Sequence, residues 1–307
     1  MSAIGLGLAA LGRPGYLNLG HGDDLGADRS VAGLERRCHE VLDVAYEAGV
    51  RHFDAARSYG RAEEFLASWL EARGIEPGAV TVSSKWGYTY TAGWQVDADP
   101  PEVKDLSLDT LRRQLAETRG LLGRWLSLYQ IHSATVSSGV LDDAGVLEQL
   151  ARLRQGGVAV GLTVTGPDQS ETIELAIERG GFDAVQATYN LLERSGGPAL
   201  ERARAAGMRV MVKEAVANGR LTPRGGCAPL EAVAERLGAT SDAVAIAAVL
   251  SRPWVDVVLS GAATPEQLRS NLGALELRWS AELDDELAGL VEPSERYWST
   301  RSELSWT

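Results

Sequence analysis

Cysteine and histidine are scarce in this chain. Its 307 residues include two cysteines, Cys38 and Cys227, and four histidines. Two cysteines so far apart in the sequence cannot build a disulfide framework, and the histidines show none of the short spacings that bind zinc. The sequence therefore predicts neither a disulfide-stabilised secreted domain nor a metal site.

Long hydrophobic runs and an excess of positive charge are also missing. The longest apolar stretches, such as AVAIAAVL at 243–250, are far shorter than the roughly 20 residues that a membrane span needs. The N-terminus lacks the basic residues that open an export signal. A net charge of −12 disfavours nucleic acid and anionic membranes as partners. We therefore expect a cytoplasmic protein that is a monomer or a small homo-oligomer. We expect it to bind neither nucleic acid nor membranes.

Short apolar runs alternate with amphipathic helical stretches along the chain, as in a parallel sheet covered by helices. No interdomain linker interrupts the alternation. We predict one α/β domain, residues 1–307, folded as a single (β/α)8 TIM barrel, with residues 276–307 as a tail near the mouth. The expected strands are 4–8, 51–54, 80–84, 127–131, 159–163, 184–187, 209–212 and 255–259. The expected helices are 31–48, 62–73, 108–122, 143–154, 168–178, 199–206, 241–250 and 265–275. No clear structure is expected at 11–30, 86–105 and 217–229.

Polar side chains end three consecutive predicted strands. Asp54, Lys85 and His132 occupy these ends, and Tyr59 follows on the loop after Asp54. The C-terminal strand ends of a parallel barrel all face one mouth, so the four can meet. An ammonium beside a phenol lowers the phenol pKa, and a histidine can orient a carbonyl oxygen. The plainer interpretation is that Asp54 caps a helix and Tyr59 packs in the core.

These residues lie in motifs that resemble the aldo-keto reductase family. GLGLAALG, FDAARSYG, SSKWG and YQIHS follow one another in family order, and GLTVTG, VQATYN and LSGAATPEQLRSNL come after them. The resemblance spans nearly the whole barrel. It implies that Tyr59 is the general acid and that Asp54, Lys85 and His132 complete a catalytic tetrad. It also implies NADPH, with NADH possible, as hydride donor for reversible reduction of an aldehyde or ketone to an alcohol.

The resemblance extends to a cofactor cradle. Thr163 and Gln186 stand where the family binds the nicotinamide carboxamide. The free amide groups at the start of the last barrel helix form a natural phosphate site. The remaining positions that the resemblance assigns to the cofactor are Gly7, Lys213, Ser260, Gly261, Ala262, Gln267 and Asn271, the last two at the adenine end.

Several positions depart from the family pattern. Lys213 begins Lys-Glu-Ala where many relatives have Tyr-Ser-Pro, whose aromatic ring stacks on the nicotinamide, and Val164 replaces an amide-binding Asn. Lys213 either reaches the pyrophosphate or pairs with Glu214 or Asp24.

The positive charges expected around the 2′-phosphate of NADPH are missing as well. Gly261 and Gln267 stand where several NADPH-preferring relatives have Lys and Arg. Arg224 and Arg269 are possible replacements, or they face solvent.

The predicted barrel lacks the N-terminal hairpin that closes the floor in many relatives, because its first strand is expected from Ile4. We expect substrate contacts from aromatic residues at the mouth, which make an apolar pocket. The candidates are Tyr16, Trp86 and Trp298, together with Trp94, Tyr297 and Trp306; each could instead anchor surface packing.

Three other functions are alternatives to carbonyl reduction. The same site permits oxidation of a sugar lactol or another alcohol. A cofactor-binding regulatory subunit without turnover is disfavoured, because all four tetrad positions are filled. A hydrolytic barrel with paired carboxylates would need Glu214 as its second acid and leaves Lys213 unexplained.

Overall fold

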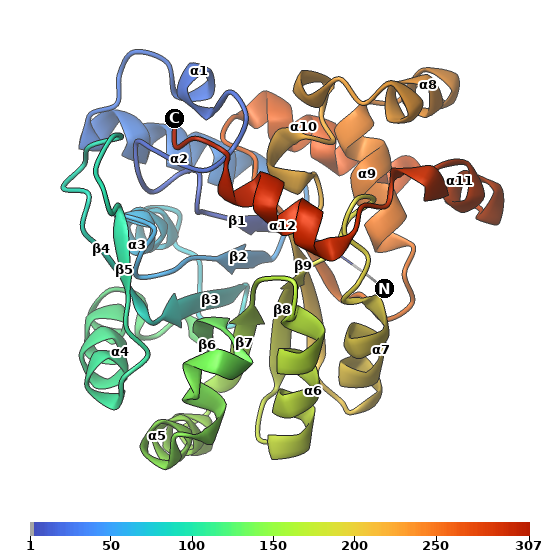
Figure 1. Ribbon diagram of the computed structural model, residues 1–307. Helices are drawn as coiled ribbons and strands as arrows, with labels where there is room; N and C mark the ends of the chain where they lie inside the picture. Colours follow the sequence, from blue (N-terminus) through green and yellow to red (C-terminus); the bar gives the residue numbers. More distant parts are fainter. Residues whose placement is uncertain (1–2) are drawn as a thin grey trace.

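The computed structural model describes residues 3–307 as a closed barrel of eight parallel strands surrounded by helices (Figure 1). The strand order around the barrel is β1-β10-β9-β8-β7-β6-β3-β2. The eight strands predicted from the sequence, and the TIM-barrel fold, are confirmed. The barrel strands are β1 (Ala3–Gly7), β2 (His52–Asp54), β3 (Thr81–Trp86), β6 (Leu126–Ala134), β7 (Ala159–Val164), β8 (Ala184–Thr188), β9 (Arg209–Lys213) and β10 (Val257–Ser260).

The helices begin where the sequence provides caps. Ser30, Ser107, Asp143 and Thr264 each accept a hydrogen bond from a backbone amide of the first turn. The helices are α1 (His21–Leu25), α2 (Val31–Glu47), α3 (Ala62–Ala72), α4 (Leu108–Leu122), α5 (Ala144–Gln155), α6 (Gln169–Arg179), α7 (Gly197–Ala205), α8 (Ala228–Leu237), α9 (Ser241–Leu250), α10 (Pro265–Leu272), α11 (Ala281–Glu286) and α12 (Ser294–Ser302). Short 3-10 turns lie at Val136–Ser138, Val140–Asp142, Ala217–Gly219, Pro223–Gly225, Gly273–Glu276 and Ala288–Leu290.

Four regions hold structure that the sequence did not predict. The segment after β3 forms an antiparallel hairpin, β4 (Tyr88–Tyr90) with β5 (Glu102–Lys104). Its arms are three residues each and twelve residues apart, so neither shows a clear period of two. The helices α1, α8, α11 and α12 were also missed. Their apolar faces are short and become recognisable only when they pack.

The inside of the barrel is filled by side chains from its own strands. Leu128, Met211, Val257 and Leu259 form a buried cluster there with Ala184. A larger apolar layer lies between the strands and the surrounding helices. Among residues 3–307, β1 is the first element, and no hairpin precedes it.

The C-terminal segment returns to the mouth of the barrel. Helix α12 lies across the strands in Figure 1. Arg301 of α12 pairs with Glu214 at 2.5 Å, just after β9. The backbones of Tyr16 and Thr307 bond each other in both directions at 3.3 Å. Loops distant in sequence are thereby joined around one opening.

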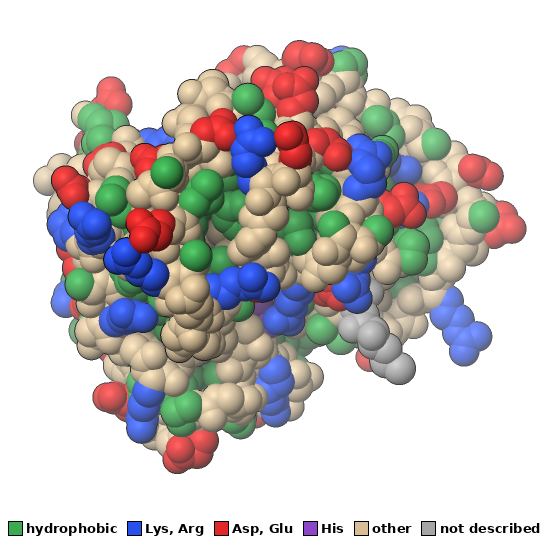
Figure 2. All heavy atoms as spheres, turned by 90° about the horizontal axis from the view of Figure 1, so that it is seen from below, with side chains coloured by type: hydrophobic (Ala, Val, Ile, Leu, Met, Phe, Trp, Pro, Cys, Tyr) green, Lys and Arg blue, Asp and Glu red, His purple; other side chains and the backbone are tan. Residues whose placement is uncertain are grey.

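The outer surface carries both signs of charge. Basic and acidic side chains are interspersed on the face shown in Figure 2, with apolar side chains between them. Within residues 3–307, no helix is long and apolar enough to cross a membrane.

Two histidines are buried without charge. His52 of β2 is 3% exposed and its Nε2 lies 3.1 Å from Ser83 Oγ. His21 of α1 is 0% exposed, and neither ring nitrogen has a hydrogen-bond partner. Burial lowers the pKa of each to about 4.

Lowering the pH from 7 to 5 is expected to reduce the free energy of unfolding. The unfolded histidines, with an ordinary pKa near 6.5, then bind protons that folded His21 and His52 do not. Their contribution is complete above that pKa and is lost as the pH falls toward 4, by about 2 kcal/mol per histidine at pH 5. Urea unfolding at both pH values measures it. His52→Gln should remove about half of the difference, and His39→Gln on α2 serves as the control; equal stability at the two pH values would contradict the prediction.

Candidate active site

A buried ion pair lies at the ends of two adjacent strands. Asp54 ends β2 and Lys85 lies near the end of β3, and the ammonium of Lys85 bonds the Asp54 carboxylate directly. Lys85 Nζ also donates to the carbonyl oxygen of Ala55 at 2.9 Å. The side chains are 1% and 3% exposed, so both charges depend on these partners.

Further donors complete the surroundings of Asp54. Its Oδ1 accepts from Ser83 Oγ at 2.6 Å and from Gln130 Nε2 at 3.2 Å. Ser83 and Gln130 were not predicted to belong to the site. Their signal in the sequence is a polar residue inside an otherwise apolar strand. They fix the orientation of the carboxylate that holds Lys85.

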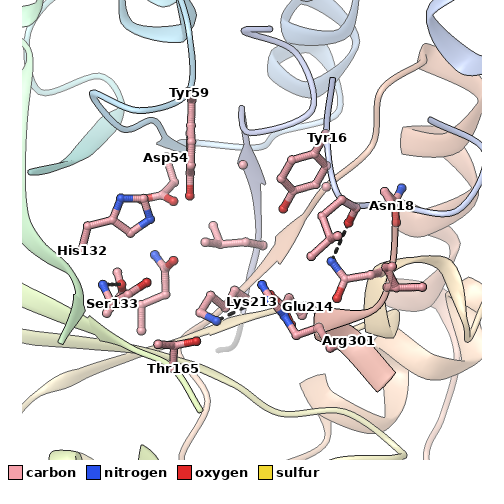
Figure 3. A pocket seen from close by; sticks show the side chains of 18 of the residues that line it. Tyr16, Asn18, Asp54, Tyr59, His132, Ser133, Thr165, Lys213, Glu214 and Arg301 are labelled. Carbon is pink, nitrogen blue, oxygen red and sulfur yellow. Dashed lines mark hydrogen bonds and ion pairs between the residues drawn. The ribbon is translucent and has the colours of Figure 1, made fainter. Parts of the chain in front are cut away.

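Tyr59 and His132 complete the group predicted from the sequence. Their rings meet edge to face with centroids 5.6 Å apart, and Lys85 Nζ lies 4.7 Å from the Tyr59 centroid. The Tyr59 hydroxyl makes no hydrogen bond within residues 3–307 and points into the opening seen in Figure 3. The four side chains are therefore brought together, with one free hydroxyl among them.

The protonation of Tyr59 differs from the sequence-based expectation. We expected Lys85 to lower the pKa of the phenol. Instead burial, and then the charge of Asp54, raise it above its ordinary value, while Arg13 lowers it. The ammonium of Lys85 is bonded to Asp54, so its charge is largely neutralised there. Tyr59 therefore keeps its proton at neutral pH, the form that a proton donor needs.

His132 is neutral at physiological pH. Burial, and then the nearby positive charge of Lys85, lower its pKa well below the ordinary value. The Tyr88 ring packs against it at 4.9 Å, and its Nδ1 has no hydrogen-bond partner. A neutral imidazole can donate one N–H to a carbonyl oxygen without transferring its proton.

Asp54, Tyr59 and His132 line a cavity of about 420 Å³, here called the mouth cavity. Gln186 lies on its wall, and its buried Nε2 has no partner. Thr163 is beside it and accepts from the Ser133 amide at 2.6 Å. The other predicted cofactor residues that line this cavity are Gly7, Lys213, Ser260 and Gly261. An unpaired amide donor on a cavity wall fits a carboxamide ligand such as nicotinamide.

A second cavity of about 310 Å³ continues from the first. Asn18, Val216 and Gly261 line both cavities, so the two form one elongated cleft. The second cavity reaches the start of α10 and is lined by Ala262, Gln267 and Asn271. The cleft therefore runs from the strand ends at the mouth to the start of α10.

The polar side chains of the second cavity are already engaged. Gln267 accepts from the Ala263 amide at 2.9 Å. Asn271 accepts from Ser260 Oγ at 2.7 Å and donates to Asp242 at 2.6 Å. The amide of Asn271 thus holds α10 against β10.

Lys213 pairs with Glu214, one of the partners that the sequence left open. Its ammonium lies 3.7 Å from Glu214 and donates to Thr188 Oγ1 at 2.7 Å. Burial lowers the pKa of Lys213 to about 8. Burial by itself raises the pKa of Glu214, but Arg301 and Lys213 more than offset this and hold it well below its ordinary value. Figure 3 shows Lys213, Glu214 and Arg301 together on the side opposite Tyr59.

The two candidate arginines have different positions. Arg224 lines the second cavity and pairs with Asp24 through contacts of 2.7 and 2.5 Å. Arg269 is 60% exposed and lies 3.5 Å from Glu266. Only Arg224 therefore lies beside the cleft.

Two of the three predicted substrate residues lie outside the mouth cavity. Tyr16 lines it, as expected. Trp86 is completely buried in the core. Successive strand side chains point to opposite faces, so Lys85 inside the barrel places Trp86 among the helices. Trp298 packs with Tyr297 in an apolar cluster beneath α12.

Other lining residues were missed by the sequence analysis. Arg13, Glu102 and Arg301 border the mouth cavity, beside Trp306, which the sequence analysis had named as a mouth candidate. Each comes from a different loop or terminal segment, and none belongs to a recognisable motif. Among the residues described, no group of three or more His, Cys, Asp or Glu side chains could hold a metal ion.

The sequence model of the Aldo/keto reductase family matches residues 29–292. The NADH-specific methylglyoxal reductase of Escherichia coli is 25% identical, over 95% of this chain and 96% of its own. The pyridoxal 4-dehydrogenase of Microbacterium luteolum is 26% identical, over 89% of each chain.

Solved structures share the fold. An aldo-keto reductase of Bacillus halodurans in its holo form superposes with a TM-score of 0.69 at 21% identity, covering 94% of this chain and 92% of the other. The glycerol dehydrogenase of Gluconobacter oxydans gives 0.71 at 20% identity, covering 94% and 90%. With the family match spanning most of the barrel, the chain belongs to the aldo/keto reductase family of oxidoreductases.

Proposed function

We propose that this protein catalyses the reversible reduction of an aldehyde or ketone to an alcohol, with NADPH or NADH as the hydride donor. The observation that carries the proposal is the meeting of the free Tyr59 hydroxyl, neutral His132 and the Lys85 and Asp54 pair at one end of an elongated cleft. When bound, the cofactor supplies a hydride to the carbonyl carbon.

The side chains at the mouth transfer the proton, orient the carbonyl oxygen and stabilise the phenolate. Tyr59, protonated at neutral pH, gives its proton to the carbonyl oxygen as negative charge develops there. His132 donates a hydrogen bond that orients the same oxygen. Lys85, fixed by Asp54, lies under the Tyr59 ring and stabilises the phenolate left after the transfer. Oxidation of an alcohol uses the same groups with Tyr59 as the proton acceptor.

The cleft supports a nicotinamide dinucleotide along its length. Gln186 and Thr163 would hold the carboxamide, and Ser260, Gly261 and Ala262 would hold phosphate at the start of α10. A Cβ added at Gly261 meets no heavy atom within 4 Å, so the backbone is open to a close ligand. Arg224 is the cation nearest the adenosine end, but it is paired with Asp24. We therefore propose a modest preference for NADPH.

The direction of the physiological reaction is a separate matter. The relatives include a protein named as a reductase and another named as a dehydrogenase. Oxidation of a sugar lactol or another alcohol is therefore kept as the second candidate. A regulatory role without turnover has less support, because the proton donor and its positioning groups are all present.

The decisive test is reduction of simple aldehydes by wild type and by Tyr59→Phe, followed through nicotinamide absorbance. The variant should lose about a hundredfold to ten-thousandfold in kcat/KM, because it has no proton to donate. Its affinity for the dinucleotide, measured by fluorescence titration, should remain close to wild type. Tyr46→Phe, on the outer face of α2, is the matched control. A Tyr59→Phe enzyme within a few-fold of wild type would refute the role of this hydroxyl.

Lys85→Met should reduce both turnover and stability. It removes the cation beside Tyr59 and leaves Asp54 buried without its ion pair, a loss that costs roughly 3 to 5 kcal/mol. Urea unfolding should show recovery in the Lys85→Met/Asp54→Asn double variant, since no uncompensated charge remains. Lys104→Met on the exposed hairpin is the control. Normal turnover by Lys85→Met would remove the ion pair from the mechanism.

Gln267→Arg should widen the preference for NADPH over NADH. A new charge-assisted bond to the 2′-phosphate contributes about 1.5 to 3 kcal/mol, or roughly tenfold or more in affinity. Titration of both dinucleotides into wild type and variant measures it. Arg269→Gln, at an exposed position on the same helix, should change neither affinity. Wild-type preference for NADH, or no effect of Gln267→Arg, would show that α10 does not hold the adenosine end.

A further inference from the structure

Arg13, in the loop after β1, is a buried cation beside the proposed proton donor. Its guanidinium carbon lies 5.4 Å from the centroids of both Tyr59 and Tyr16 and 4.5 Å from the Trp306 ring. Nη1 donates to the carbonyl oxygen of Ser58 and to Glu102, both at 2.9 Å. Nη2 makes no hydrogen bond within residues 3–307. Arg13 is 3% exposed and lines the mouth cavity.

Two glycines fix this position by close backbone contact. A Cβ at Gly12 would come 2.2 Å from the Tyr59 carbonyl oxygen, and one at Gly60 would come 2.4 Å from the Gly12 carbonyl oxygen. The Arg61 amide donates to that same Gly12 oxygen at 2.7 Å. The loop after β1 is therefore held against the loop that carries Tyr59, and Arg13 with it.

The charges around the mouth cavity do not balance locally. Lys85 and Asp54 neutralise each other, and Glu214 is shared by Lys213 and Arg301. Arg13 has one partner, Glu102, whose side chain is 22% exposed at the rim on β5. Four cations thus face three carboxylates around the cavity; the surplus cation lies with Lys213 and Arg301, while Arg13 relies on one partly exposed carboxylate.

The surroundings of Arg13 favour one chemical class of ligand. A guanidinium presents paired N–H groups that match the two oxygens of a carboxylate. Tyr16 and Tyr59 border the same part of the cavity in Figure 3, and Trp306 packs on Arg13, so aromatic surfaces flank the charge. They can pack against the apolar body of a substrate whose carbonyl meets the Tyr59 hydroxyl.

We propose that Arg13 is a specificity-determining residue, and that the preferred substrates carry a carboxylate in addition to the reacting aldehyde or ketone. The inference rests on the proposed carbonyl reduction and names its substrate class. The carboxylate takes the free Nη2 and partly replaces Glu102, which occupies the position of a resident counter-ion. Arg13 thus holds the carboxylate end of the substrate while Tyr59 acts on the carbonyl at the other end.

The test compares 4-formylbenzoate with 4-formylbenzamide, two aldehydes of nearly the same shape that differ in charge. Wild type should show a kcat/KM about tenfold to a hundredfold higher for the carboxylate. Arg13→Gln should abolish this ratio, because kcat/KM should fall much further for the carboxylate than for the amide. Arg61→Gln, an exposed neighbour paired with Glu64, is the control and should keep the wild-type ratio. Glu102→Gln, which removes the competing anion, should raise the ratio and tests the inference even if Arg13→Gln does not fold.

A binding measurement separates this inference from the proposed function. Binding of 4-(hydroxymethyl)benzoate and 4-(hydroxymethyl)benzamide, followed by calorimetry, should show the same preference and the same loss in Arg13→Gln. If wild type reduces neither aldehyde, the proposed function fails and the binding ratio decides the role of Arg13. If the ratios are equal in wild type and Arg13→Gln, or both ligands weaken alike, Arg13 only holds the loops together and the inference is overturned.

Discussion

The candidate site depends on one buried ion pair, Lys85 with Asp54. Neither charge has access to bulk water, so each is stable only with the other and with the neutral donors and acceptors around it. A closed parallel barrel makes this pair possible, because its strands end at one level and place adjacent side chains side by side. Tyr59 lies over the pair and His132 beside Tyr59, so their arrangement follows from the pair's position.

The same constraint explains the protonation of the site. In a cavity shielded from water, burial raises the pKa of a phenol and lowers that of an imidazole, and both groups are neutral at physiological pH. Because the charge of Lys85 is neutralised by Asp54, the Tyr59 hydroxyl keeps its proton at neutral pH when no substrate is bound. Lys85 is close enough to stabilise a Tyr59 phenolate when one forms, yet Tyr59 is protonated in the resting protein. A proton donor in a reversible reaction requires both properties.

The rim of the cavity is held by ion pairs between segments that are distant in the sequence. Glu102 on the β4 and β5 hairpin pairs with Arg13, 89 residues away, and Arg301 on α12 pairs with Glu214, 87 residues away. These pairs join loops and the C-terminal segment across the opening. In each pair one side chain is partly exposed, Glu102 at 22% and Arg301 at 26%, while its partner, Arg13 or Glu214, is buried.

The sequence by itself determined the barrel and which polar residues end its strands. Strand length, helix caps and the alternation of elements are local features, and a parallel barrel converts a residue's place at a strand end into a place at the mouth. For that reason Asp54, Lys85 and His132 could be placed together before any contact was known. Only the tertiary structure decided the rest. The inward direction of Lys85 sends Trp86 into the helical layer, Trp298 of α12 packs into an apolar cluster, and loop contacts bring Arg13 to the cavity. None of these follows from periodicity, because each depends on which distant surface the side chain meets.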